Sequence, residues 1–338
     1  MLYITTRDNK DAFTAHRALS DDLAPDGGHF IPLTMPDYDR TEIAALREKS
    51  FGQVVAEILN TFFSSRLTGW DVEFCIGRNV ARLISMSHRI TVAELWHNPD
   101  EKYSYIVNRL YEKIYDNADI LKTPTDWVKI AIQIAVLFGL YGELLKAEIT
   151  SCDQTVDISV SADGFSAPMA AWYARKMGLP IGTIICTCEE NSSVWDLIHR
   201  GVFNTATAQD DLLMGIERLI QATLGFEAVK SYLAKCQNRQ IFSVIEGAQG
   251  ILNNGFFCAV AGENRSESII NSVFRSSSYV IDPCTALCYG GLQDYRARTG
   301  GSRMTLLLAE RIPIDFTAEI AKATGIPKEK IVDYVNLS

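Results

Sequence analysis

The 338-residue chain contains no run of lysine or arginine, and its 41 acidic residues outnumber its 32 basic ones, giving a net charge of −9. A surface of this kind does not attract phosphate backbones or anionic lipid headgroups. We therefore expect no binding to nucleic acid or to membranes, and partners that are small molecules or other proteins.

Long apolar runs are also missing. No stretch approaches the roughly 18 uninterrupted apolar residues that a membrane span needs, and the N-terminus, "MLYITTRDNKDAF", lacks the apolar core of a signal peptide. These features predict a cytoplasmic protein. Because 47% of the residues are hydrophobic, we expect the chain to fold around its own core without disulfide support.

No histidine lies near the closely spaced cysteine pairs Cys186/Cys188 and Cys284/Cys288, so the usual ligand set of a zinc site is absent. Eight cysteines in a chain of this length do not form a disulfide framework. Most of them lie in apolar runs, which predicts buried free thiols and no metal site.

The pattern along the chain changes near residue 126. Residues 11–23, 41–65 and 71–86 have the spacing of helices, with a turn at 24–32. Helices and short apolar strands then alternate through "WVKIAIQIAVLFGLYGELL", "VDISVS", "FSAPMAAWYARKMG", "IGTIICT" and "SVWDLIHRG". This alternation predicts an α/β fold with a parallel sheet covered on both faces. The first of these segments is apolar nearly all round, so we expect it to be buried in the core or in a homodimer contact.

Further helices are expected near 209–224, 264–276 and 315–323 and after Pro283, with a strand at 304–309. Ligands of open α/β sheets bind where strands end and helices begin. Candidate residues are therefore expected at three such junctions.

The first junction is "SVSADGFSAP" (159–168), where a phosphate loop would need several glycines. Only Gly164 is present, and the carboxylate of Asp163 would repel an anion. A turn that caps the next helix explains these residues better than a phosphate site does.

The other two junctions leave alternatives open. In "VIDPCTALCYGG" (280–291) a strand is expected to end at Asp282, which can serve equally as a helix N-cap or as a ligand contact. Glu310 follows the strand at 304–309, where a solvated loop is the commoner explanation and a ligand contact remains possible.

The order of several motifs resembles the threonine synthase family. The opening "LYITTRDNKDAFTAHRALSDDLAPDGGHFIP" is similar to the family's first residues, "ELWHNP" (94–99) to Glu-Leu-Phe-His-Gly-Pro, and "DWVKIAIQ" (126–133) to Asn-Trp-x-Arg-x-x-x-Gln. "AAWYARKMGLPIGTIICT", "GIERLI" and "YVIDPCTAL" follow in the family's order. The resemblance covers nearly the whole chain.

This resemblance implies the architecture of fold-type-II pyridoxal-phosphate enzymes, which is similar to tryptophan synthase β, and conversion of phosphohomoserine to threonine. It also implies a domain division: an N-terminal helical domain at 1–90, a remnant of the cofactor-lysine and small-domain region at 91–125, and a large α/β domain at 126–338. Only 22 residues separate Ser104 from Trp127, too few for a complete small domain.

The functional positions of the family are altered in this chain. The family's Phe-Lys-Asp, whose lysine forms the imine with the cofactor, falls on Tyr103-Ser104-Tyr105, and a serine hydroxyl cannot form that bond. Lys102 is a possible substitute. However, the helix start expected from Asn98, Pro99 and Glu101 would direct Lys102 and Ser104 to nearly opposite sides.

The remaining cofactor contacts are altered as well. The phosphate loop Pro-Ser-Gly-Asn-Phe-Gly falls on Ser161, Ala162, Asp163, Gly164, Phe165 and Ser166. The family's Thr-Ala-His-Pro, whose threonine faces the pyridine nitrogen, falls on Glu310-Arg311-Ile312-Pro313, and its Asp-Pro-His-Thr on Asp282-Pro283-Cys284-Thr285. The substrate loop Ser-Gly-Asp-Thr-Gly is not found.

Three functions follow from these observations. The first is a threonine synthase-like protein that has lost pyridoxal-phosphate catalysis, needs no cofactor, and acts as a scaffold, regulator or partner subunit. The second is a small-molecule-binding protein or an enzyme with changed chemistry, with Asp163, Asp282, Thr285, Glu310 and Arg311 as crevice groups. The third is an active lyase that uses Lys102.

Overall fold

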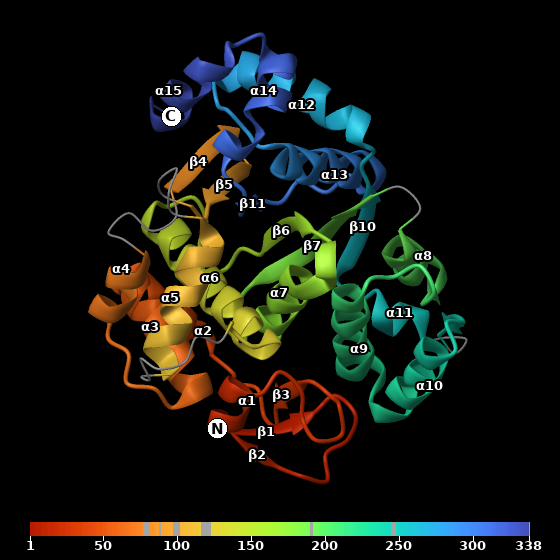
Figure 1. Ribbon diagram of the computed structural model, residues 1–338. Helices are drawn as coiled ribbons and strands as arrows, with labels where there is room; N and C mark the ends of the chain where they lie inside the picture. Colours follow the sequence, from red (N-terminus) through yellow and green to blue (C-terminus); the bar gives the residue numbers. More distant parts are fainter. Residues whose placement is uncertain are drawn as a thin grey trace.

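The computed structural model describes residues 1–338 except 77–81, 88, 97–101, 116–122, 190–191, 245–247 and 338. Its centre is a six-stranded sheet with the strand order β10-β7-β6-β11-β5-β4 (Figure 1). The first five strands in this order run parallel, and β4 pairs antiparallel with β5 at the edge. The bounds of these strands are Arg82–Ser87 (β4), Ile90–Glu94 (β5), Val156–Ser161 (β6), Ile181–Cys188 (β7), Phe256–Val260 (β10) and Thr305–Ala309 (β11).

Alternating residues of each strand pack on opposite faces of the sheet, as the two-residue period of a strand requires. Ile184 faces the main core, which includes residues of α6 (Asp126–Lys146) and α7 (Ser166–Lys176), whereas Ile185 faces α13 (Pro283–Thr299). The sheet therefore has helices on both faces, and α7 begins shortly after β6 ends.

The N-terminal segment combines a small antiparallel sheet with helices. The sheet has the order β2-β1-β3, with β1 Leu2–Thr5, β2 Phe13–Thr14 and β3 Phe30–Pro32. The helices are α1 Ala15–Ser20, α2 Arg40–Ala45, the 3₁₀ turn η1 Leu46–Glu48, α3 Phe51–Phe63, α4 Gly69–Ile76 and α5 Tyr103–Tyr115. Helix α3 packs against α6, so one hydrophobic core continues from this segment into the α/β part.

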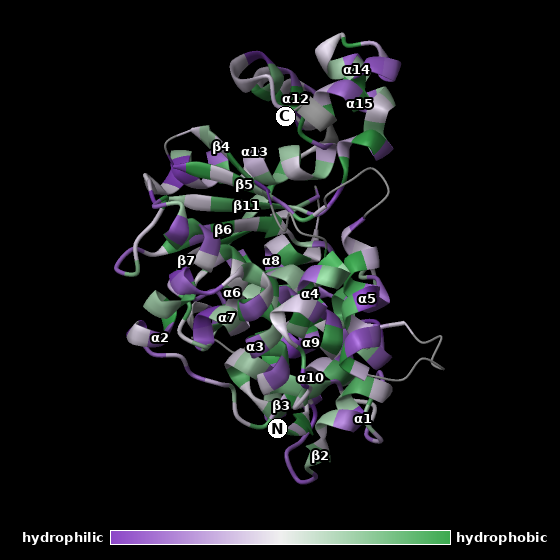
Figure 2. Ribbon diagram, turned by 90° about the vertical axis from the view of Figure 1, so that its left-hand side faces the viewer, coloured by the Kyte–Doolittle hydropathy of each residue, from purple (hydrophilic) through white to green (hydrophobic). Residues whose placement is uncertain are grey.

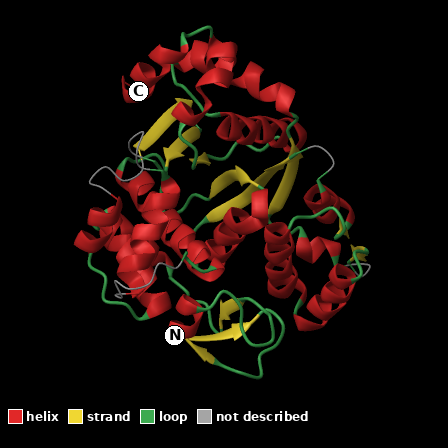
Figure 3. Cartoon of the chain, in the orientation of Figure 1, coloured by secondary structure: helices red, strands yellow, loops and turns green. Residues whose placement is uncertain are grey.

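Two further groups of elements complete the chain (Figure 3). After β7 come α8 Ser193–Arg200, β8 Val202–Asn204, α9 Asp210–Leu224, α10 Phe226–Gln237, β9 Ile241–Ser243 and α11 Gln249–Leu252. The C-terminal part contains α12 Glu263–Ser277, α14 Thr317–Thr324 and α15 Lys328–Leu337, and the 3₁₀ turns η2 and η3 span Asp163–Phe165 and Pro313–Phe316. A separate small cluster that includes Trp96, Ile312 and Ile331 anchors the C-terminal helices.

Most predicted elements of the α/β part are present, but three details differ. Residues 82–87 form edge strand β4 instead of continuing a helix, and no strand ends at Asp282, because residues 278–282 have irregular structure. In the N-terminal part, the predicted helix over 11–23 is limited to α1 and is preceded by β2. The domain division at residue 90 remains a prediction, although β4 lies before it and pairs with β5 after it.

By length and composition alone, helix α6 could cross a membrane. However, 83% of its most apolar 18-residue segment is buried inside the protein. It packs against α3, α5 and α7. Helices in Figure 2 carry both hydrophilic and hydrophobic residues, as expected where one side faces a core and the other faces water. The prediction that α6 lies in the core is confirmed, whereas the homodimer remains a prediction.

Candidate functional site

A cavity of about 320 Å³ lies where α5, the first half of α6, the start of α7 and the segment after β11 meet. Pockets that bind small molecules begin near this size. The lining residues are Lys102, Tyr103, Ser104, Val107, Asn108, Lys129, Gln133, Ser166, Glu310, Arg311, Ile312 and Asp315.

Five residues predicted from the sequence come together in this cavity: Lys102, Ser104, Ser166, Glu310 and Arg311. They are distant in the chain but meet because β11 has β5 and β6 as parallel neighbours, so the carboxyl ends of these three strands lie at the same edge of the sheet.

Lys102 and Ser104 both line this cavity, and the expectation that their side chains point to nearly opposite sides remains a prediction. Lys102 precedes the first turn of α5, and its carbonyl accepts hydrogen bonds from the N–H groups of Tyr105 and Ile106. The cap expected from Asn98, Pro99 and Glu101 lies outside the described residues. One face of α5 is apolar and packs into the protein, because Ile106, Leu110 and their neighbours on this face are buried.

The ammonium of Lys102 is held by an ion pair, with 2.9 Å between its Nζ and Oδ2 of Asp315. The hydrogen bond and the charge of Asp315 raise the pKa of Lys102 above its ordinary value. Imine formation requires the neutral amine, so this pairing opposes the chemistry that a substitute lysine would have to perform.

Glu310 is a partly buried carboxyl group at the end of β11. Among the described residues, none donates a hydrogen bond to its side chain or forms an ion pair with it. Burial raises the pKa of Glu310, with Asp163 and Asp282 adding to the rise and Arg311 opposing it. A donor group in the cavity would stabilise the ionised carboxylate.

The loop from Ser161 to Ser166 uses three of its six backbone N–H groups within the protein. The N–H of Ala162 donates to the carbonyl of Thr187, that of Asp163 to Ser161 Oγ, and that of Phe165 to the carbonyl of Ala162. The cofactor implied by the family resemblance needs free N–H groups around its phosphate, so this loop does not fit it.

A second carboxylate makes the same loop less suitable for an anion. A Cβ atom placed on Gly164 would lie 3.1 Å from Oδ2 of Asp211 in the first turn of α9, so that carboxylate lies directly beside the loop. Asp163 and Asp211 thus bring two negative charges to the loop where, by the resemblance to the family, the phosphate of the cofactor would lie.

Asp282 serves as a helix cap. Its Oδ1 accepts hydrogen bonds from the backbone N–H groups of Cys284 and Thr285, at 2.9 and 3.0 Å. Both Asp282 and Thr285 are buried, and burial raises the pKa of Asp282 to about 6. Of the two alternatives left open for Asp282, the structure shows the cap, and neither residue is among the described residues that line the cavity.

Sequence analysis did not predict the other lining residues of the cavity, among them Tyr103, Lys129 and Gln133. The signal for two of them was available, because Lys129 and Gln133 are four residues apart in "DWVKIAIQ" and therefore lie on one face of α6. Tyr103 Oη and Gln133 Oε1 are buried and have no hydrogen-bond partner among the described residues.

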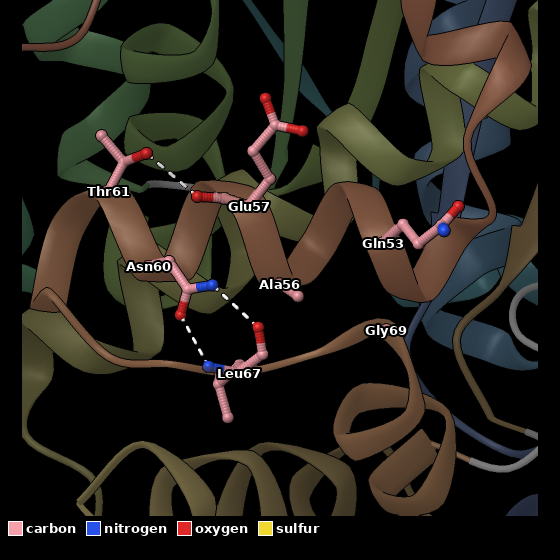
Figure 4. A pocket seen from close by; sticks show the side chains of 7 residues that line it. All are labelled: Gln53, Ala56, Glu57, Asn60, Thr61, Leu67 and Gly69. Carbon is pink, nitrogen blue, oxygen red and sulfur yellow. Dashed lines mark hydrogen bonds between the residues drawn. The ribbon is translucent and has the colours of Figure 1, made fainter.

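A second hollow, of about 460 Å³, lies between α3 and the segment that leads into α4 (Figure 4). Its polar groups are already paired, since Asn60 bonds both the N–H and the carbonyl of Leu67, and Glu57 pairs with Lys49. The two hydrogen bonds of Asn60 hold the chain between α3 and α4 in place.

The eight cysteines are free, and five of them are buried, as predicted. In the part of the chain that the structure describes, no three histidine, cysteine or acidic side chains lie together as metal ligands. Cys188 and Cys258 approach to 3.3 Å between their sulfur atoms within the core.

Comparison with known proteins gives relatives of one kind. The family model described as threonine synthase N terminus matches residues 2–79. Threonine synthase-like 1 of Pongo abelii and of Homo sapiens are each 24% identical over 174 residues, which is 48% of this chain and 23% of theirs. The matched part thus spans about a quarter of the length of these relatives. The threonine synthase of Schizosaccharomyces pombe is 27% identical over 106 residues, 29% of this chain and 21% of its own length.

Solved structures extend the similarity to the whole fold. A pyridoxal-phosphate-bound threonine synthase from Brucella melitensis aligns with a TM-score of 0.81 at 18% identity, over 99% of this chain and 94% of that chain. The yeast threonine synthase aligns with a TM-score of 0.78 at 16% identity, over the same shares. The chain is therefore similar in sequence to threonine synthases and threonine synthase-like proteins, and it has the fold of the solved threonine synthases, that of type-II pyridoxal-phosphate enzymes.

Proposed function

We propose that this threonine synthase-like protein has lost pyridoxal-phosphate catalysis and acts as a scaffold, a regulator or a partner subunit. A single observation carries the proposal: Ser104 stands where the family resemblance puts the imine lysine, and the amine of Lys102, two residues earlier in the chain, is paired with Asp315 at 2.9 Å. The occupied N–H groups of the loop at 161–166 support it independently.

Imine formation can be measured directly. The purified protein is mixed with pyridoxal phosphate, reduced with borohydride and mapped by peptide mass spectrometry, with Ser104→Lys as a variant that restores an amine at the family's position. We expect labelling at Lys102 to be no greater than at the exposed Lys328. An adduct at Lys102 that approaches one per chain, and that Lys102→Ala removes, would contradict the proposal.

A second function, binding of a small molecule in the cavity, is favoured by a separate observation. Glu310, Tyr103 Oη and Gln133 Oε1 line one cavity without hydrogen-bond partners among the described residues, and an unpaired buried polar group is costly. A ligand screen by thermal unfolding tests this function. A compound should raise Tm in the native chain but not in Glu310→Gln, and a rise equal in both would exclude this site.

A further inference from the structure

We propose that the cavity binds a small zwitterion whose ammonium group is held by Glu310 and whose acid group faces Lys129 and Arg311. The proposal rests on the proposed function, because it requires a cavity that holds no covalently bound cofactor.

One part of the cavity is rich in acceptors. The carboxylate of Glu310 has no hydrogen bond or ion pair with any described residue, and Tyr103 Oη and Gln133 Oε1 are likewise unpaired. Tyr103 is only 8% exposed, so water cannot easily replace a missing partner for its hydroxyl. A primary ammonium group has three N–H donors and a positive charge, and it would satisfy all three oxygens.

A neutral donor, a metal ion and the amine of Lys102 each fit these oxygen atoms less well than the ammonium group of a ligand does. Asp163 and Asp282 add negative charge near Glu310, which favours a cation over a neutral donor. The described residues contain no set of side chains suited to a metal ion. The ammonium group of Lys102 forms its ion pair with Asp315 and not with Glu310.

The same cavity also contains two exposed cations, Lys129 on α6 and Arg311 after β11, which form no ion pair with a described residue, although the charges of Asp126 and Glu310 act on them. A simple amine would leave both charges unpaired and would be repelled by them. An acid group on the same ligand would pair with them, and a guanidinium such as that of Arg311 binds a carboxylate with two parallel hydrogen bonds. Val107 and Ile312 supply an apolar wall for a short carbon chain between the two charged ends.

The two charges of the ligand should be separated by several bonds. Lys129 and Glu310 come from different walls of the cavity, one from helix α6 and the other from the end of strand β11. A volume of about 320 Å³ accommodates an aliphatic amino acid in an extended conformation.

Isothermal titration calorimetry with 5-aminopentanoate tests the proposal. Pentanoate, which lacks the ammonium, and pentylamine, which lacks the carboxylate, are matched probes of the same chain length. We expect 5-aminopentanoate to bind at least tenfold more tightly than either probe. Equal affinity for all three, or no measurable binding of 5-aminopentanoate, would overturn the proposal.

Three variants test whether 5-aminopentanoate binds in this cavity. Glu310→Gln should weaken binding of 5-aminopentanoate at least tenfold, Tyr103→Phe should weaken it to a smaller extent, and Glu319→Gln, at an exposed position of α14, should leave it unchanged. Circular dichroism confirms that each variant is folded. Unchanged affinity in folded Glu310→Gln would overturn the site.

L-Norvaline, in which both charges lie on adjacent atoms, tests their separation. Tighter binding of L-norvaline than of 5-aminopentanoate would overturn the separated-charge arrangement. The calorimetric results do not depend on imine formation, because they are measured on cofactor-free protein and test only whether the zwitterion binds. An adduct at Lys102 would instead contradict the proposed loss of catalysis.

Discussion

A single buried arginine connects the N-terminal sheet to the two helices behind it. The guanidinium of Arg218, 1% exposed, bonds Oδ2 of Asp126 through two of its nitrogens and donates to the carbonyl of Phe30 at 2.8 Å. Although burial acts in the opposite direction, the charges of Arg218 and His29 lower the pKa of Asp126. His29 lies in the same cluster, 3.8 Å from Asp126, and is itself buried.

His29 makes the stability of the protein depend on pH. Burial, together with the charge of Arg218, lowers the pKa of His29 from 6.5 to about 4. Between these values the unfolded chain binds a proton that the folded chain does not, so the free energy of unfolding falls as the pH drops from 6.5 towards 4. Since one pKa unit corresponds to about 1.4 kcal/mol, the loss should reach about 3 kcal/mol.

Denaturant unfolding at pH 7.0, 5.5 and 4.5 measures this effect. We expect His29→Gln to reduce the loss between these pH values, and His16→Gln, at an exposed position, to leave it as in the native chain. Parallel pH dependence in all three proteins would show that His29 is not the group responsible.

At the scale of elements, α9 fixes the conformation of the loop from Ser161 to Ser166. Gly164 and Phe165 both have left-handed backbone angles, with φ of 57° and 56°, and Phe165 is buried. Gly215 of α9 allows this contact, because a Cβ there would lie 2.3 Å from the carbonyl oxygen of Gly164. A left-handed phenylalanine is strained and persists only where its surroundings hold it.

Gly215→Ala should therefore lower the free energy of unfolding by about 1–3 kcal/mol, since the added methyl group overpacks the contact between loop and helix. Gly250→Ala in α11 is the matched control. No described atom lies within 4 Å of its new Cβ, so it should be neutral or stabilising by up to about 1 kcal/mol. Guanidinium chloride unfolding measures both changes, and equal effects would refute the packing explanation.

Sequence patterns predicted elements where local chemistry decides them, and failed where the tertiary structure decides. Pro283 after Asp282 correctly predicted a helix start, because a cap and a first-turn proline act within a few residues. The same apolar stretch before Asp282 suggested a strand that is absent, since pairing depends on which strands are neighbours. Residues 82–87 are the opposite case. The spacing of their apolar residues predicted a helix, but they form strand β4, which pairs with β5.

The site was partly predictable for a related reason. Ser104 and Glu310 were located from motif order, and the parallel neighbours β5 and β11 explain why their segments meet. The pairing of Lys102 with Asp315 was not predictable, because these residues are brought together by the C-terminal segment and not by any local pattern. Contacts between residues on opposite sides of a cavity can be identified only once the fold is known.

At the scale of the whole molecule, one core joins the N-terminal helices to the sheet. It runs from Tyr3 through α3 and α6 to Leu306 in β11. Because α6 is covered within a single chain, it offers no apolar face to a second copy, and a homodimer would have to use another surface. Light scattering that shows a monodisperse monomer at micromolar concentration would contradict the homodimer prediction.

A shared core predicts that these parts unfold together. Phe138 of α6 is fully buried, and its ring lies 5.3 Å from that of Tyr38. Phe138→Ala should lower the free energy of unfolding by about 3–5 kcal/mol and keep one transition, coincident by tryptophan fluorescence and far-ultraviolet circular dichroism. Phe74→Ala removes a ring that is 76% exposed on α4 and should change stability by less than about 0.5 kcal/mol. Two separate transitions in Phe138→Ala would mean that the N-terminal helices and the α/β part are stabilised independently, in spite of the packing of α3 on α6.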